Sequence, residues 1–350
     1  PLTSSEITLF TSRHDGIVGL VSGENWRWAR TALQLAGFEK DSDGNYFTPL
    51  TDIARARQSL AALGGTALAH EALVATNGSR YIGDFARELG ENLPGQWSVR
   101  VENYPVPIVQ EDLLYDLWTP RADPLAHTVK TERLLAAAIL RGESGVELAV
   151  VPVPGRDQYR VGALIPADMN LTPEVAGPSS ITVGDAQAHA AHHVSSSLLV
   201  EYHHAFWRVQ LITLRNDLDW AHEAYEPGTV TDPPQHDLAD AFARFADAAP
   251  HIISTVRASN AQLNPHEKAF LEDMDAVFGQ PALPQEASTT PQRTSDPDPL
   301  AVWLLEGKDL VDLARSVSRA SWPRTALAPV RTAAALPSPP LQIAASLNRR

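Results

Sequence analysis

The chain of 350 residues contains no cysteine, which excludes disulfide bonds, thiolate zinc sites and thiol nucleophiles. It also lacks any run of about eighteen apolar residues, so the sequence predicts no transmembrane helix. The segment from Pro1 to Glu6 has neither a basic stretch nor an apolar signal core. With 44% hydrophobic residues the chain can bury a core. We therefore expect a soluble, cytoplasmic protein.

The familiar enzyme motifs are also missing. The sequence has no phosphate-binding Gly-x-x-x-x-Gly-Lys-Ser/Thr loop, no Gly-x-Gly-x-x-Gly after a strand, no Gly-x-Ser-x-Gly elbow and no His-Glu-x-x-His. The pair His70-Glu71 is not followed by a second histidine at the required spacing. These absences favour a protein that is not an enzyme and predict no organic cofactor.

Basic residues are fewer than acidic ones, with 28 Lys and Arg against 42 Asp and Glu, so the net charge is −14. That balance disfavours nucleic-acid binding by the folded body, since phosphate contacts need clustered Lys and Arg. The C-terminal stretch from 313 to 350 differs, because it holds six arginines and no acid. A basic tail on an acidic body leaves nucleic-acid contact open as an alternative.

The pattern of elements predicts an α+β fold that starts with a small ββαβα unit over residues 1–65. Strands are expected at 6–11 and 16–22, joined by a turn ending at Gly16. The helix at 25–36 has an apolar side, and Gly64-Gly65 is expected to end the second helix. That apolar side consists of Trp28, Ala32 and Leu35.

Residues 7–63 contain Gly-Leu-Val-Ser-Gly, then Ala-Leu-Gln-Leu-Ala-Gly-Phe, then Asp-Gly-Asn-Tyr-Phe-Thr-Pro. This succession resembles a small unit in uncharacterised accessory proteins of actinobacterial plasmids and integrative elements. The aromatic pair that such units often carry after Gly-Phe is replaced by Glu39-Lys40. The resemblance implies a mobile-element setting and no catalytic residue.

Residues 66–183 read as a mixed α+β region. Its clearest feature is an antiparallel hairpin, with strands at 146–153 and 158–165 around Pro154-Gly155. A strand is also expected at 97–104, and prolines 105 and 107 limit the next segment to an edge or a loop. Helices are expected at 66–76, 80–93 and 125–140.

Residues 184–279 read as a helical region that begins with a helix from Asp185 to Tyr225. No Gly or Pro interrupts this run, and its apolar residues recur every three or four positions. Its length makes a kink plausible, which we place near Asn216-Asp217. We expect the sheet of the middle region to pack on this helix.

The long helix also carries five of the twelve histidines within sixteen residues. Spacings of three and four can bring imidazole and carboxylate groups to one face of a helix, where they could hold a divalent metal with ligands from another helix. The candidate ligands are His189, His193, Glu201 and His204. The same residues also fit a solvated polar stripe, or a pH switch.

The C-terminal part is expected to hold a linker at 280–297, an amphipathic helix at 298–322 and a basic, disordered tail at 323–350. The helix keeps apolar residues at a spacing of three and four through Gly307. Its stripe can pack on the body, on a second copy or on a protein partner. The candidate partner-binding residues are Leu300, Trp303, Leu304, Leu310, Val311, Arg315 and Arg319.

Three acids, Glu111, Asp112 and Asp116, flank apolar residues within the middle region, and Tyr115 lies beside them. Paired carboxylates can act as acid and base, but no second catalytic signal lies nearby, so we interpret them as solvated charges at the edge of a core element. The leading hypothesis is a non-enzymatic accessory protein that acts through protein–protein interaction, in a mobile-element or nucleic-acid-processing context. The alternatives are a nucleic-acid-binding protein that uses the tail and a His/carboxylate metalloenzyme.

Overall fold

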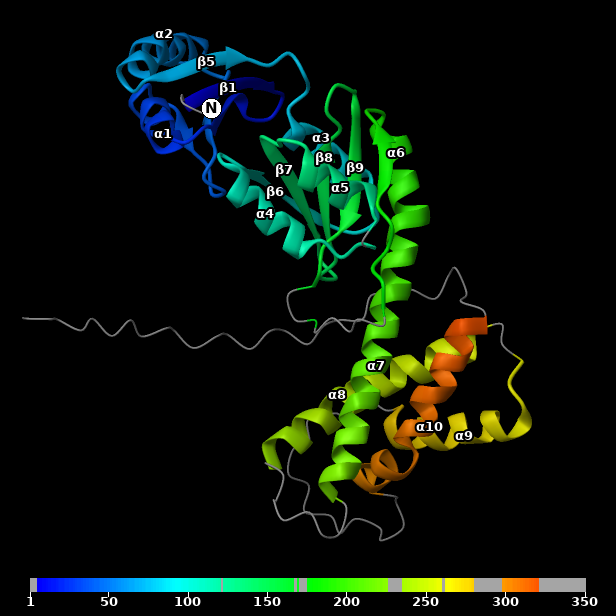
Figure 1. Ribbon diagram of the computed structural model, residues 1–350. Coiled ribbons are helices and arrows are strands. Elements are labelled where there is room, and N and C mark those ends of the chain that lie inside the picture. The colour runs from blue at the N-terminus through cyan, green and yellow to red at the C-terminus, as the bar shows by residue number, and fades with distance from the viewer. Residues whose placement is uncertain are drawn as a thin grey trace, which may run out of the picture.

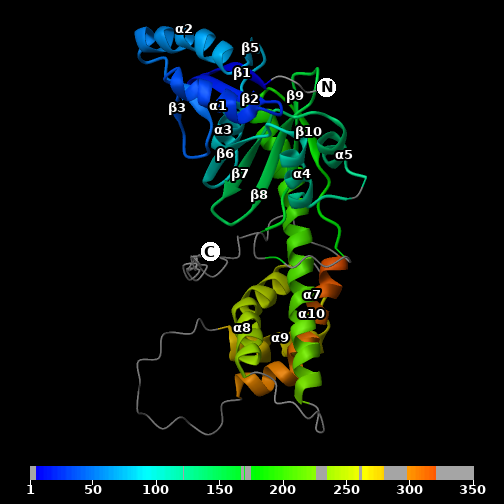
Figure 2. The same cartoon turned by 60° about the vertical axis from the view of Figure 1, so that its left-hand side comes forward.

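The computed structural model describes residues 5–120, 122–166, 169, 175–225, 235–259, 262–279 and 298–320. It confirms the α+β class, because two five-stranded sheets and their helices form one half of the molecule and a helical bundle forms the other. Figures 1 and 2 show the single long helix that runs from one half into the other.

The first sheet has the strand order β3-β4-β2-β1-β5. β1 and β2 pair antiparallel around the turn that ends at Gly16, as the sequence predicts, and β5 pairs parallel with β1. A side chain at Gly16 would meet the Thr48 carbonyl oxygen, and its φ of 84° favours glycine. The strands are β1 (Ser5–Ser12), β2 (Gly16–Ser22), β3 (Glu39–Lys40), β4 (Tyr46–Thr48) and β5 (Ala72–Thr76).

Both faces of the first sheet are covered, since alternate residues of its strands enter different cores. Ile7 and Leu9 face α1 (Trp26–Leu35) and α2 (Ile53–Ala69). Phe10 and Leu20 join the core that contains α3 (Ile82–Asn92). Because successive side chains of a strand point to opposite faces, the apolar residues of these strands are divided between the two cores.

The second sheet is an antiparallel meander in the order β10-β9-β8-β7-β6. The predicted hairpin is confirmed as β8 and β9, and the strand expected at 97–104 is confirmed as β6. The strands are β6 (Trp97–Asn103), β7 (Ala136–Gly142), β8 (Glu147–Pro152), β9 (Gln158–Ala163) and β10 (Ile181–Gly184).

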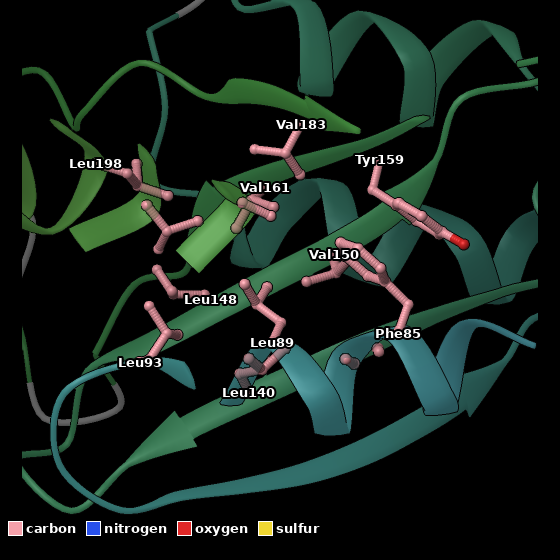
Figure 3. Close-up of a cluster of buried hydrophobic side chains, with 14 of the residues drawn as sticks. Phe85, Leu89, Leu93, Leu140, Leu148, Val150, Tyr159, Val161, Val183 and Leu198 are labelled. Atoms are coloured by element: carbon pink, nitrogen blue, oxygen red, sulfur yellow. The ribbon is translucent and has the colours of Figure 1, made fainter. Parts of the chain in front are cut away.

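Helices cover the second sheet on both faces. Figure 3 shows one face, where Phe85 and Leu89 of α3 pack on Leu140, Val150 and their neighbours. The rings of Phe85 and Tyr159 stack with centroids 3.7 Å apart. α4 (Pro107–Asp116) and α5 (Pro124–Thr131) bury their apolar residues on the opposite face.

Two asparagine side chains tie the sheets together. Asn103 of β6 accepts a hydrogen bond from the Val21 amide (3.3 Å) and donates to the Val21 carbonyl (3.1 Å), as a neighbouring strand would. Its amide also donates to the Leu135 carbonyl at 2.8 Å. Asn45 donates to the Val101 carbonyl at 2.8 Å. Buried backbone groups that no strand reaches are satisfied in this way.

The expected long helix is present as three consecutive segments, α6 (Gln187–His193), a π-helical turn (Val194–Leu198) and α7 (Leu199–Tyr225). The irregularity lies at this π turn, whereas the sequence placed a kink near Asn216-Asp217. Leu198 and Tyr202 belong to the core of the second sheet, as expected, and Leu211 and Leu218 to that of the bundle.

The bundle is completed by α8 (Gln235–Ala258), α9 (Pro265–Phe278) and α10 (Pro299–Ala320). α8 continues through Pro250, and α9 begins with a reciprocal capping box between Asn264 and Glu267. Ion pairs join α8 to its neighbours, from Arg244 to Asp217 of α7 and from Arg257 to Asp275 of α9.

Three predicted segments differ in the structure. The segment 66–76 is not a helix, because α2 continues through Gly64-Gly65 to Ala69 and β5 follows. The boundary at residue 65 therefore cuts α2, and the N-terminal unit includes β5.

The segment 125–140 contains α5 and then β7, in which the small side chains of Ala136, Ala137 and Ala138 fit a strand covered on both faces. Pro107 opens a helix, since a first-turn proline lacks only an amide that needs no partner.

The expected linker at 280–297 and tail at 323–350 lie outside the described residues. None of the helices in the described part of the chain combines the length and apolar character needed to cross a bilayer.

Candidate functional site

The four candidate metal ligands are spread along the long helix and do not meet. His189 and His193 are exposed on α6, whereas Glu201 and His204 lie on α7 beyond the π turn. The Glu201 carboxylate accepts a hydrogen bond from the Ser179 amide at 3.2 Å. No three histidine, aspartate or glutamate side chains among the described residues could hold a metal ion together. Metal binding therefore stays a prediction without an assembled site.

Two other histidines are half-buried. Burial lowers the pKa of His203, and the neighbouring His204 lowers it further. Burial also lowers the pKa of His251, whose ring meets the Trp207 ring edge-on at 5.2 Å. Both side chains favour the neutral form in the folded protein.

The apolar stripe of α10 packs inside the bundle. Trp303, Leu310 and Val311 are buried among α7, α8 and α9, and Leu300 and Leu304 are half-buried against the same core. Of the three arrangements open to this helix, the structure shows packing on the body of the same chain. Arg315 pairs with Asp312, and the side chain of Arg319 lies outside the described residues. These apolar residues therefore stabilise the bundle.

Polar contacts fix α10 along α7. Arg215 of α7 pairs with Asp312, and Lys308 donates to Asp219 at 2.8 Å. The ammonium of Lys308 lowers the pKa of Asp219. Gly307 faces α7 and α8, and a Cβ added there would come within 3.1 Å of Leu218 and 3.3 Å of Phe245.

A shallow hollow of about 480 Å³ lies where the turn after β1 meets α3 and β6. Its polar lining includes His14, Arg87 and Glu91, and Trp97 forms part of the wall. Arg87 is held by Asp15 at 2.6 Å. No hydrogen bond joins the three polar groups to one another, although all are described residues. The hollow thus presents no assembled acid–base pair.

The outer side of α1 and α2 exposes apolar and cationic side chains together. Trp28 was expected on the buried side of its helix, but Ala29, Ala32 and Leu33 face the sheet and Trp28 is 57% exposed. Its ring stacks on His70 with centroids 5.6 Å apart, and Leu68 nearby is 81% exposed. We call this the α1–α2 surface, formed by Arg27, Trp28, Leu35, Arg57, Leu68 and His70.

The charge of this surface is opposite to that of the chain. α1 and α2 carry four arginines and no acid. Arg55 pairs with Glu39 at 2.7 Å, whereas Arg27 and Arg57 form no ion pair within the described residues. Four arginines without an acid in two adjacent helices are visible in the sequence, but the exposure of Trp28 is not.

The exposed side of α4 has the complementary character. Ile108 is 67% exposed and Tyr115 is 75% exposed, and the acids between and beside them are exposed as well. The helix contains no Lys or Arg, and its carboxylates form no ion pair with any described residue. We call this the α4 face, formed by Ile108, Glu111, Asp112, Tyr115 and Asp116.

Comparisons of the chain with protein-family models, with curated proteins and with solved structures found no match.

The packing of Gly307 generates a test of the α10 interface. Gly307→Val should lower the free energy of unfolding by about 1–3 kcal/mol, because the new side chain overpacks the contact with Leu218 and Phe245. The matched control is Gly64→Val in α2, where an added Cβ meets nothing within 4 Å. Urea unfolding measures both. An equal effect of the two substitutions would contradict the close packing.

The half-buried histidines His203 and His251 generate a pH dependence. Because the pKa values of His203 and His251 are lowered in the folded state, the unfolded chain binds more protons once the pH falls below the ordinary value of 6.5. The free energy of unfolding should therefore fall from pH 7 to pH 5. His251→Phe keeps a ring beside Trp207 and should make the fall shallower.

Urea unfolding at several pH values measures this slope. The control is His192→Asn on the exposed side of α6. This variant should show the same dependence of unfolding free energy on pH as the wild type. Stability that rises on acidification, or equal slopes for wild type and His251→Phe, would show that burial of His251 does not control the pH dependence.

Proposed function

We propose that this chain is a non-enzymatic, cytoplasmic accessory protein that acts through protein–protein interaction, with the α1–α2 surface as its binding site. The resemblance of residues 7–63 to plasmid accessory proteins suits such a role in a mobile-element setting.

The observation that carries the proposal is the distribution of exposed apolar side chains. Of the eleven large apolar side chains exposed among the described residues, seven lie between Trp28 and Val74. Large apolar residues gathered on one part of a surface are characteristic of interaction sites. The N-terminal unit therefore has more apolar surface than its own fold uses.

The composition of the surface also supports a protein partner. Interfaces are enriched in tryptophan and arginine, and these residues contribute most to binding energy when a partner covers them. Trp28 is held in place by its stack on His70, so little side-chain freedom is lost on binding.

The edge of the first sheet adds to this apolar area. β5 is an edge strand of five residues, and both Leu73 and Val74 on it are exposed. Edge strands of this kind are usually shielded by charge, proline or a covering element. β5 itself carries neither a charge nor a proline.

The test is capture of binding proteins by the full-length chain in nuclease-treated extract. Wild-type protein should enrich at least one protein about tenfold or more over Trp28→Ala/Leu68→Ser, because both substitutions remove large exposed apolar side chains from the surface. The matched control is Leu305→Ser in α10, where the leucine is 79% exposed but belongs to the bundle. Identical capture by all three proteins would refute the proposal.

A further inference from the structure

The structure contains two unpartnered surfaces of opposite charge. The α1–α2 surface combines Trp28, Leu35 and Leu68 with arginines, and the α4 face combines Ile108 and Tyr115 with carboxylates. Each is both apolar and charged, so each needs a partner that supplies apolar contact and the opposite charge.

The two surfaces cannot meet within one molecule. α1 and α2 cover the outer face of the first sheet, whereas α4 covers the face of the second sheet that lies away from α3. The segments that precede α1 and α4 approach each other, since the Gly23 amide donates to the Pro105 carbonyl at 3.0 Å, but Figures 1 and 2 show α2 and α4 apart in both views. A contact between these surfaces requires two molecules.

We propose that the α4 face of one copy of this chain binds the α1–α2 surface of a second copy, in a head-to-tail contact. This inference rests on the proposed function, because it names the partner of the α1–α2 surface. The two patches differ, so the contact is heterologous and leaves one free surface on each end molecule of an assembly.

The dimensions of the two surfaces agree. α1 and α4 each contain ten residues, which corresponds to about 15 Å of helix. α1 and α2 run antiparallel side by side, since Trp28 lies on His70 and the Thr66 hydroxyl donates to the Ala32 carbonyl at 3.1 Å. A helix as long as α4 therefore covers the surface from the Trp28 end to the Leu35 end.

The shape of α2 leaves room for such a helix. Gly64 and Gly65 lie in the C-terminal half of α2, and an added Cβ at either position would meet nothing within 4 Å. The backbone is exposed there between Leu68, about one turn from Gly64, and Arg57, about two turns from it. A second helix can approach closely at such a place.

The charges on each side are available for the contact. Arg27 and Arg57 lack an ion pair among the described residues, and so do Glu111, Asp112 and Asp116. Pairing across the interface therefore breaks no ion pair of the described structure. Exposed ion pairs of this kind add specificity and are weakened by salt.

Sedimentation velocity on the purified, nuclease-treated full chain tests the proposal. The weight-average sedimentation coefficient should rise between about 5 and about 200 µM protein and fall when the salt is raised from about 50 to about 500 mM. Trp28→Ala/Arg57→Glu and Asp112→Arg/Tyr115→Ala should each weaken association at least about tenfold. Leu305→Ser, with a similarly exposed leucine outside both surfaces, should associate like the wild type.

Mixing the two double variants distinguishes a head-to-tail contact from any other. Trp28→Ala/Arg57→Glu keeps an intact α4 face and Asp112→Arg/Tyr115→Ala keeps an intact α1–α2 surface, so an equimolar mixture should form a one-to-one dimer that grows no further. Circular dichroism of each variant establishes that it is folded.

Several results would overturn the proposal. A chain that stays monomeric at every concentration and salt, or variants that associate like the wild type, would exclude this contact. So would a mixture of the two variants that stays monomeric. Binding of a labelled single-stranded oligonucleotide that depends on Trp28 would assign the surface to stacked bases.

These outcomes are separable from those of the proposed function. A monomeric chain whose capture of another protein still depends on Trp28 and Leu68 would remove self-association and leave the binding role in place.

Discussion

The structure depends on one helix that is buried in two cores. Tyr202 is packed among the side chains of the second sheet, and Trp207 five residues later lies in the core of the bundle. α7 is therefore covered by apolar contacts from both halves along adjacent turns. Because most helical stability in proteins comes from such packing, each half supports the helix that the other half needs. The polar contacts of Arg215 and Asp217 with α10 and α8 fix the bundle around the same helix.

The π turn at Val194–Leu198 belongs to this arrangement. A π turn changes the direction of the residues that follow it relative to those before it. Val194, Leu198 and Leu199 all lie in the sheet core, while His192 and His193 stay exposed. The histidines that look clustered in the sequence are divided between a solvated helix face and a packed one.

The sequence predicts the parts of the fold in which periodicity and turn chemistry agree. β8 and β9 alternate around Pro154-Gly155, and the long helix keeps its apolar stripe without interruption. Prediction from the sequence fails where burial on both faces of a sheet overrides the helix preference of the residues. Ala136 to Ala138 favour a helix by composition, yet they lie in a strand covered on both faces.

The candidate sites are predicted less well than the fold, because they depend on what lies opposite each face. The stripe of α10 looks identical whether it packs on its own chain or on another, and only the tertiary structure places Trp303 in the core. Trp28 shows the opposite case, since its helix buries Ala29, Ala32 and Leu33 and leaves the larger side chain outside. The described residues of the N-terminal unit form no acid–base pair and no metal cluster. The exposed apolar and cationic side chains on its outer surface are therefore the best candidates for a functional role.

The claim that both halves share one helix is tested most directly by amide hydrogen exchange measured across a urea titration of the full chain. If both halves depend on this helix, amides of β8 and of α10 lose protection in the same transition. Tyr202→Ala, a change in the sheet core that should cost about 3–5 kcal/mol, then moves both transitions to lower urea together. Separate transitions, with that of α10 unchanged by Tyr202→Ala, would show that the bundle does not depend on the sheet half.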